Sequence, residues 1–125
     1  MLINLTPHPI VVFDPKSCVF DHAKRRLRLR TDVTPNVIKR LPGTRWPARC
    51  KSRFEETGEV GGIPVLQSQL QEIVNLPREK AGVTLVVSAH ALFGAKEQGR
   101  TDCACPSRLV CDETGQIVGC TAFAK

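Results

Sequence analysis

The stretch VTLVVSAHALFGAKEQG, residues 83–99, changes its hydrophobic pattern in the middle, and it decides which fold class the chain can adopt. Residues 83–87 are a short β-branched run, which predicts a buried β-strand. Residues 89–98 favour a short helix that ends at Gly99. Ser88 lies at the junction, where its hydroxyl is expected to cap the first helical turn. The chain therefore combines a buried strand with a helix that follows it directly.

The segments around this unit predict further strands. RLVCDETGQIVGCTAF, residues 108–123, gives two strand patterns around a DETG turn in which Gly115 can adopt a positive φ. Residues 49–56 and 62–69 predict a second hairpin with a long TGEVGG loop. We therefore expect an α+β fold with a small, mainly antiparallel, bent or barrel-like β-sheet and one short helix.

The first residues, MLINLTPHPIVVF, predict a strand over residues 2–13 that is bent at Pro7 and Pro9. Proline removes hydrogen-bond donors from a sheet, so the bend is expected at a sheet edge or rim. The two prolines fix the backbone on both sides of His8. We therefore expect the bend to aim the His8 side chain.

The size of the chain, 125 residues, fits a single domain over residues 1–125. The N-terminus does not have the pattern of a signal peptide, and the apolar runs are shorter than a membrane span of about 20 residues. We therefore expect a cytoplasmic protein without membrane contact. The sequence leaves the oligomeric state open.

The positive charge is concentrated in an insert-like, loop-rich segment over residues 16–53, where 12 Lys and Arg and 2 Asp give +10. The remaining 6 Lys and Arg and 10 Asp and Glu give −4. Nucleic-acid binding through this segment is one alternative function. Against it, the chain has no Tyr and one Trp, so no stacking platform accompanies the charge. The arginines that would carry such binding are Arg25, Arg26, Arg28 and Arg30.

Polar residues at breaks in the apolar elements form a candidate ligand site. Such positions are where a rigid scaffold presents chemistry, and a guanidinium beside a helix N-terminus suits an anion. Alternatively, Arg100 and Asp102 pair with one another and Ser88 is only a helix cap. The candidate ligand-binding residues are Thr6, His8, Ser88, His90, Arg100 and Asp102.

Six cysteines are present, three of them in CACPSRLVC at positions 103, 105 and 111, with Cys120 following. Structural zinc sites usually use two CxxC-like pairs, and that spacing is absent here. We therefore expect small buried apolar side chains, no metal and no cofactor.

The segments NLTPHPI, GIPV, LVVSAHAL, GRTD and DETGQIVGC resemble a family of small bacterial and bacteriophage proteins that has no established activity. The resemblance covers about half of the chain, whereas the segment 16–53 and TDCAC depart from the pattern. A phage context implies a small interaction or host-interfering protein.

These observations together favour a non-enzymatic protein that binds a small anionic, nucleotide-like ligand or a protein partner. A small hydrolase or transferase using His8 or His90 is the other alternative, and no confident pair of base and nucleophile supports it.

Overall fold

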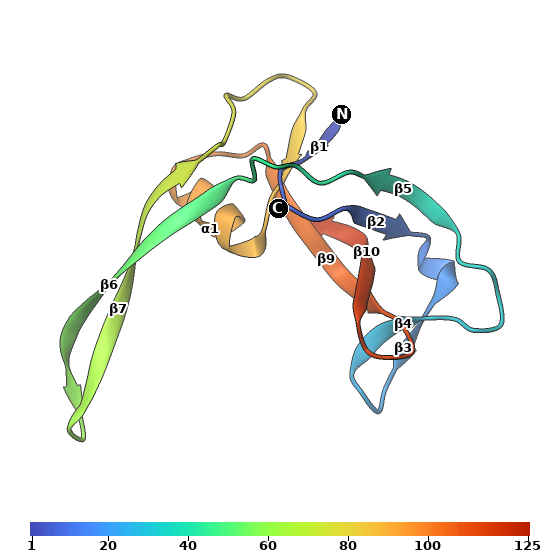
Figure 1. Cartoon of the computed structure of the whole chain (residues 1–125), viewed down its shortest axis with the longest axis horizontal. Coiled ribbons are helices and arrows are strands. Elements are labelled where there is room, and N and C mark those ends of the chain that lie inside the picture. The colour runs from blue at the N-terminus through green and yellow to red at the C-terminus, as the bar shows by residue number, and fades with distance from the viewer.

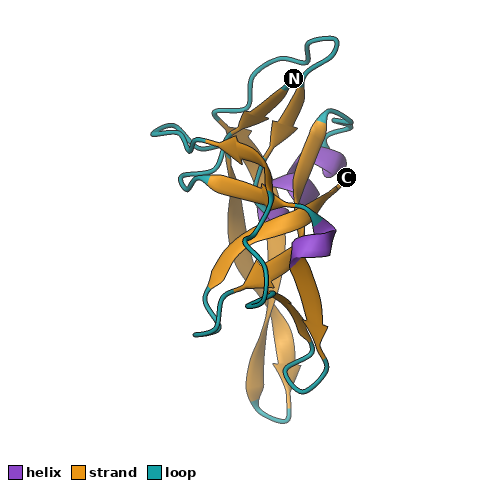
Figure 2. Cartoon of the chain, turned by 90° about the vertical axis from the view of Figure 1, so that its right-hand side faces the viewer, coloured by secondary structure: helices purple, strands orange, loops and turns teal.

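The structure is a computed structural model of the whole chain, and it describes residues 1–69 and 72–125 with their side chains. Strands make up most of the molecule (Figure 2). The helical elements are a short 3₁₀ turn, η1 (Pro15–Ser17), and the helix α1 (Ala89–Glu97). The strands are β1 (Leu2–Asn4), β2 (Ile10–Phe13), β3 (Cys18–Asp21), β4 (Arg26–Leu29), β5 (Val37–Leu41), β6 (Arg49–Val60), β7 (Ile63–Val74), β8 (Thr84–Val86), β9 (Cys103–Cys111) and β10 (Ile117–Ala124).

Most strands belong to one mixed sheet that curves into a nearly closed barrel (Figure 1). The strand order is β1-β8-β9-β10-β2-β5, with β4 also paired to β9 and β3 paired to β4. Strands β1, β8 and β9 run parallel, whereas the β9–β10, β2–β5 and β3–β4 pairs are antiparallel. The predicted α+β fold, with a bent, barrel-like sheet and one short helix, is confirmed. The sheet is mixed rather than mainly antiparallel, because β10–β2 and β4–β9 also pair in parallel. No helix in the described part of the chain is long and apolar enough to span a membrane.

The elements β8, α1 and β9 form a βαβ unit at the centre of the fold. The pattern of residues 83–99 predicts its first strand and its helix, but not the parallel pairing of β9 with β8. Val86, in the middle of the three parallel strands, is fully buried. The Ser88 hydroxyl accepts a hydrogen bond from the backbone N–H of Ala91 at 3.1 Å and caps the helix. Gly99 has a φ of 79°, a conformation that commonly follows a helix end.

The buried side chains form two clusters. One joins α1 to β8 and β9, and the other joins β2, β5, β8 and β10. The basic segment 16–53 contributes β3, β4 and β5 to the sheet, and Leu41 of β5 belongs to the second cluster. Part of the segment that looks like an insertion is therefore built into the barrel.

Strands β6 and β7 form a separate antiparallel hairpin that projects away from the barrel (Figure 1). Each strand has 12 residues, and the turn between them consists of Gly61 and Gly62, with φ of 58° and 78°. Positive φ at both positions is typical of the type I′ turn, which suits the twist of a hairpin. The expected long TGEVGG loop is therefore wrong, because residues 57–60 belong to β6.

Candidate functional site

The TPHP turn, residues 6–9, is held in place by the buried side chain of Asn4. The Asn4 amide nitrogen donates to the backbone oxygens of His8 at 2.9 Å and of Leu41 at 3.3 Å. Its amide oxygen accepts from the backbone N–H and the hydroxyl of Thr6, at 2.9 Å and 2.7 Å. Thr6 therefore shapes the turn. Asn4 is not among the residues predicted from the sequence. A local signal exists, because an Asn two residues before a Thr is typical of an Asx-turn.

The turn leaves the His8 side chain exposed at an apolar hollow of about 300 Å³. The hollow is lined mainly by Ile10 of β2, by Pro106 and Leu109 of β9, and by Ile117 of β10. Leu109 and Ile117 remain 43% and 59% exposed. Since the side chains around His8 are apolar, the hollow suits an apolar side chain better than an anion.

Ser88 and His90 lie at the same end of the sheet as the TPHP turn. Strands β1 and β8 are parallel, with Asn4 opposite Val86, so the chain leaves both strands at one edge. The Ser88 hydroxyl is engaged in capping α1, and His90 is exposed in the first helical turn. This edge therefore brings Ser88 and Thr6 near one another in the fold, but each side chain bonds to its own local backbone.

Arg100 and Asp102 lie at the other end of the βαβ unit, between α1 and β9. The Arg100 guanidinium donates to both oxygens of Asp102, at 3.0 Å and 2.8 Å, and to the backbone oxygen of Pro77 at 2.7 Å. The Glu79 carboxylate lies 3.3 Å from its Nε. The Arg100–Asp102 hydrogen bonds lower the pKa of Asp102 and raise that of Arg100. Arg100 is thus the anchor of the loop that precedes β8.

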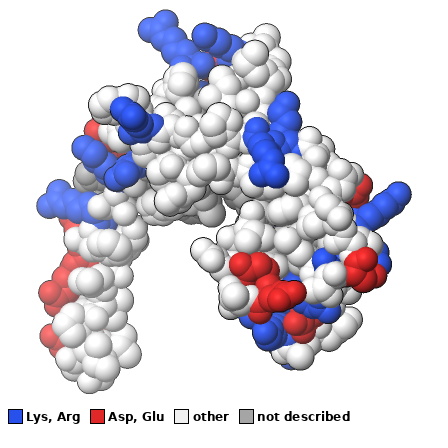
Figure 3. Space-filling view, turned by 45° about the vertical axis from the view of Figure 1, so that its right-hand side comes forward, with Lys and Arg blue, Asp and Glu red and all other residues white. Residues whose placement is uncertain are grey.

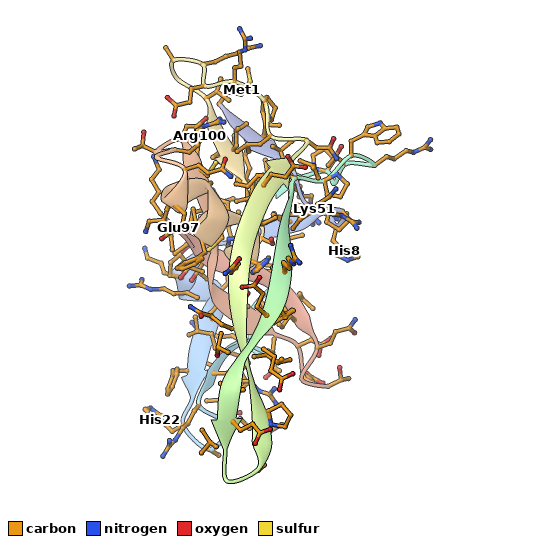
Figure 4. All side chains as sticks on the ribbon, turned by 90° about the vertical axis from the view of Figure 1, so that its left-hand side faces the viewer. Met1, His8, His22, Lys51, Glu97 and Arg100 are labelled. Carbon is orange, nitrogen blue, oxygen red and sulfur yellow. The ribbon has the colours of Figure 1, made fainter. Side chains whose placement is uncertain are left out.

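The candidate ligand residues therefore do not form one site. Figure 4 shows His8 and Arg100 on different sides of the molecule. The structure shows the alternative prediction, in which Arg100 and Asp102 pair with one another. An anion at the TPHP turn would lack the guanidinium that was expected to hold it.

Two arginines of the basic segment pair with its two aspartates, both of which are already counted in the net charge of +10. Arg30 donates to both oxygens of Asp32, at 3.0 Å and 2.6 Å, and Arg28 Nε lies 4.0 Å from the Asp21 carboxylate. Arg25 lies in the turn between β3 and β4, with a φ of 53°. The arginines considered for nucleic-acid binding, Arg25, Arg26, Arg28 and Arg30, thus lie on or beside β4, with two of them facing carboxylates.

Most of the cysteines are core side chains. Cys103, Cys105, Cys111 and Cys120 are buried. Burial, together with the nearby Asp102 carboxylate, raises the pKa of the Cys103 thiol to about 11. Thiols with a raised pKa stay protonated and react slowly. Within the described residues, no three His, Cys, Asp or Glu side chains are grouped so that they could hold a metal ion.

The β6–β7 hairpin carries a large uncovered apolar surface. We call residues 54–69 the arm, and every residue in it is exposed. Phe54, Ile63 and Leu66 are 64%, 69% and 60% exposed. The strand register places Phe54 and Leu66 on one face of the arm, and Val60 and Ile63 on the other. A two-stranded ribbon is only marginally stable in water, so these faces are typical of a surface that a partner covers.

A second hollow, of about 490 Å³, lies at the base of this hairpin. It is lined mainly by Leu5, Trp46, Ile73 and Leu76, and Trp46 is 75% exposed. Exposed tryptophans are enriched among the residues that dominate protein–protein binding. A second exposed apolar surface therefore lies at the base of the hairpin.

The arm is acidic, whereas the rest of the chain is basic. It contains Glu55, Glu56 and Glu59 and no Lys or Arg, which gives a net charge of −3 against +9 for the remaining residues. Figure 3 shows acidic side chains along the projecting hairpin, and a wide concave space between the free end of the hairpin and the barrel. The arm thus differs from the barrel in the sign of its net charge and in leaving all of its side chains exposed.

Comparisons with known proteins found no matching family model, no similar curated protein and no similar solved structure.

Proposed function

We propose that this protein is a non-enzymatic binding protein that contacts a protein partner through the arm. The supporting observation is that residues 54–69 are exposed on both faces and carry the apolar side chains of Phe54, Val60, Ile63 and Leu66. Burying one such side chain stabilises a complex by about 1.5–3 kcal/mol. In the free chain these apolar side chains are exposed to solvent and do not contribute this stabilisation.

A protein partner has more support than a small anionic ligand. The donors of Arg100, the cation expected to hold an anion, are engaged by Asp102 and by the backbone of Pro77. The hollow beside His8 is lined by apolar side chains. Exposed aromatic and aliphatic side chains like those of the arm typically contact the apolar core of a protein–protein interface.

The resemblance to small bacterial and bacteriophage proteins agrees with this proposal, because a small non-enzymatic phage protein commonly acts by contacting other proteins. We therefore include interference with a host protein. This part of the proposal is an analogy at the level of the family.

Photo-crosslinking in the cells that naturally make the protein tests the proposal. Phe54 is replaced by the photoreactive benzoylphenylalanine in one variant and Leu66 in another. Phe20 of β3, which is also exposed but lies outside the arm, is the matched control position. We expect light-dependent protein adducts from positions 54 and 66 in clear excess over position 20.

Mass spectrometry then identifies what is attached to the arm, whether another protein or a second copy of the chain. Either adduct supports a protein-binding arm. Adduct yields at positions 54 and 66 no higher than at position 20 would contradict it.

A further inference from the structure

We infer that residues 39–51 form a binding site for single-stranded nucleic acid, in which a base stacks on Trp46 and the phosphates contact Lys and Arg side chains. We call these residues the basic track. The track lies outside the arm, so this inference does not depend on the proposed function. The cations of the track are Lys39, Arg40, Arg45, Arg49 and Lys51, and it contains no Asp or Glu.

The positive charge of the basic track is open to a ligand. All five cations are exposed, and among the residues that the structure describes none of them forms an ion pair. Two carboxylates lie on the strands that neighbour the track, Asp14 directly after β2 and Glu72 of β7. Asp14 already accepts two hydrogen bonds from nearby residues. Arg53 separates the track from Glu55, the first carboxylate of the arm. The track therefore keeps a local excess of positive charge.

Trp46, near the middle of the track, has a fixed backbone and an uncovered ring. The backbone N–H of Thr44 donates to the backbone oxygen of Thr6 at 2.9 Å. The N–H of Ala48 donates to the backbone oxygen of Leu5, also at 2.9 Å. The loop is thus tied to the end of β1 on both sides of Trp46, while the indole remains 75% exposed. A large aromatic ring presented in this way suits a ligand that stacks on it.

The hollow of about 490 Å³ beside the indole has the lining that a base requires. Thr44 and Asn75 contribute polar groups to it, and Leu5 and Ile73 contribute apolar ones. The Asn75 amide nitrogen donates to the backbone oxygen of Pro47 at 3.2 Å, which joins this side of the hollow to the loop. Unstacked bases are recognised through their flat faces by aromatic rings and through their edges by hydrogen bonds. The hollow offers both kinds of contact.

The charges around Trp46 favour a nucleic acid over a protein. Trp46 directly follows Arg45 and lies three residues before Arg49. The cores of protein interfaces are depleted in charged residues, whereas proteins that bind single strands combine cations along the backbone with aromatic rings on which bases stack. In a duplex the bases are already stacked on one another. A single strand therefore fits the track best.

The basic track also has the extended form that a linear polyanion requires. It runs from β5 at the barrel through the loop into β6 of the hairpin (Figure 1). The Cys50 side chain lies against α1 at Gly94, so Arg49 and Lys51 lie on the face of β6 that points away from the helix. Figure 3 shows Lys and Arg side chains over the base of the projecting hairpin and acidic ones farther along it. Cations spread along a line can contact successive phosphates.

The fluorescence of Trp46 tests the inference in the purified full-length chain. The chain has one Trp and no Tyr, so its indole emission comes from this residue alone. We expect single-stranded oligo(dT) or oligo(U) to quench the emission, because a base stacks on the ring. Quenching by either one supports the site, and the stronger of the two identifies DNA or RNA as the ligand. Duplex DNA and heparin, a polyanion without bases, should quench several-fold less at the same concentration of charge.

Variants separate stacking from charge, with the anisotropy of a fluorescent oligonucleotide as the measurement. Trp46→Ala should weaken binding about tenfold, and Trp46→Phe should restore part of the loss. A salt slope of about −0.7 for each neutralised phosphate gives about −3.5 for five cations, and Arg45→Ser with Arg49→Ser should reduce it by about 1.4. Lys24→Ser with Arg25→Ser removes the same charge outside the track and should leave affinity and slope unchanged.

Circular dichroism establishes that each variant is folded, which we expect because all the substituted side chains are exposed. The absence of oligonucleotide binding at low salt would overturn the inference. It would also be overturned by unchanged affinity of Trp46→Ala, by equal quenching with heparin, or by an equal loss in the Lys24 and Arg25 control. These results leave the crosslinking test of the arm unaffected, so the two proposals fail separately.

Discussion

The Asn4 amide nitrogen lies 2.9 Å from the backbone oxygen of His8, so a buried side chain of β1 fixes the shape of the proline-flanked turn. Pro7 and Pro9 have no backbone N–H with which the turn could be closed. The Asn4 amide supplies the missing donor and also bonds to Leu41 of β5. One side chain thus joins the turn to both β1 and β5, and it places His8 beside the hollow.

Replacing Asn4 by Ala should destabilise the protein by about 1–3 kcal/mol, because buried backbone oxygens lose their donor. Urea unfolding followed by circular dichroism measures this change. Asn36→Ala is the matched control, since Asn36 is exposed and should be close to neutral. Equal stability of the two variants would show that the Asn4 network does not hold the turn.

Gly119→Ala should also destabilise the protein, because β10 and β2 approach too closely there for a side chain. An added Cβ would clash with the backbone oxygen of Val11 and would lie 2.6 Å from the Phe13 ring. Overpacking of this kind costs about 1–3 kcal/mol. A melting temperature unchanged by the substitution would mean that the barrel is more open between these strands.

Arg100→Ala should lower stability rather than weaken ligand binding, because the guanidinium anchors Asp102 and the Pro77 loop. Charge-assisted hydrogen bonds of this kind contribute about 1.5–3 kcal/mol. Arg30→Ala breaks a similar but exposed pair and should change the melting temperature little. A large effect of Arg30→Ala and none of Arg100→Ala would contradict this assignment.

The Arg100–Asp102 pair also predicts the pH dependence of stability. The Asp102 pKa is lowered in the folded protein, mainly by the Arg100 hydrogen bonds. Its contribution is therefore fully present above the usual carboxyl pKa and is lost as the pH falls through the lowered value. The stability difference between wild type and Asp102→Asn should shrink in acid. A difference that stays constant down to low pH would argue against the pair.

Thiol labelling should divide the cysteines by burial. At pH 8, Cys103, Cys105, Cys111 and Cys120 should resist an alkylating reagent in the native protein and react after unfolding in urea. For Cys103 the raised pKa of about 11 adds to the effect of burial. Mass spectrometry of peptides measures each site, and rapid native labelling of Cys103 would show that its strand opens.

The local elements of the fold can be predicted from the sequence because their signals are local. The strand-to-helix junction at Ser88 and the turn at Gly115 each depend on a few adjacent residues, and both are confirmed. The length of β6 cannot be predicted in this way. Residues 57–60 have turn-like composition, and an arm exposed on both faces lacks the alternation that burial imposes on a strand.

The candidate site is harder to predict because it depends on contacts between distant segments. The hollow beside His8 requires β2 to pair with β10, and no local pattern indicates that parallel pairing. The Arg100–Asp102 pair is local and is foreseen as an alternative, but the bond from Arg100 to Pro77 spans 23 residues. That long-range bond identifies Arg100 as an anchor.

If a protein covers the arm in the cell, position 54 is chemically less accessible there than in the purified protein. Phe54→Cys is labelled with a membrane-permeant maleimide in cells and again in dilute purified protein, with Phe20→Cys as the control. We predict that position 54 is labelled readily in the purified protein and is several-fold protected in cells, while position 20 is labelled equally in both. Equal labelling of position 54 in both settings would contradict it.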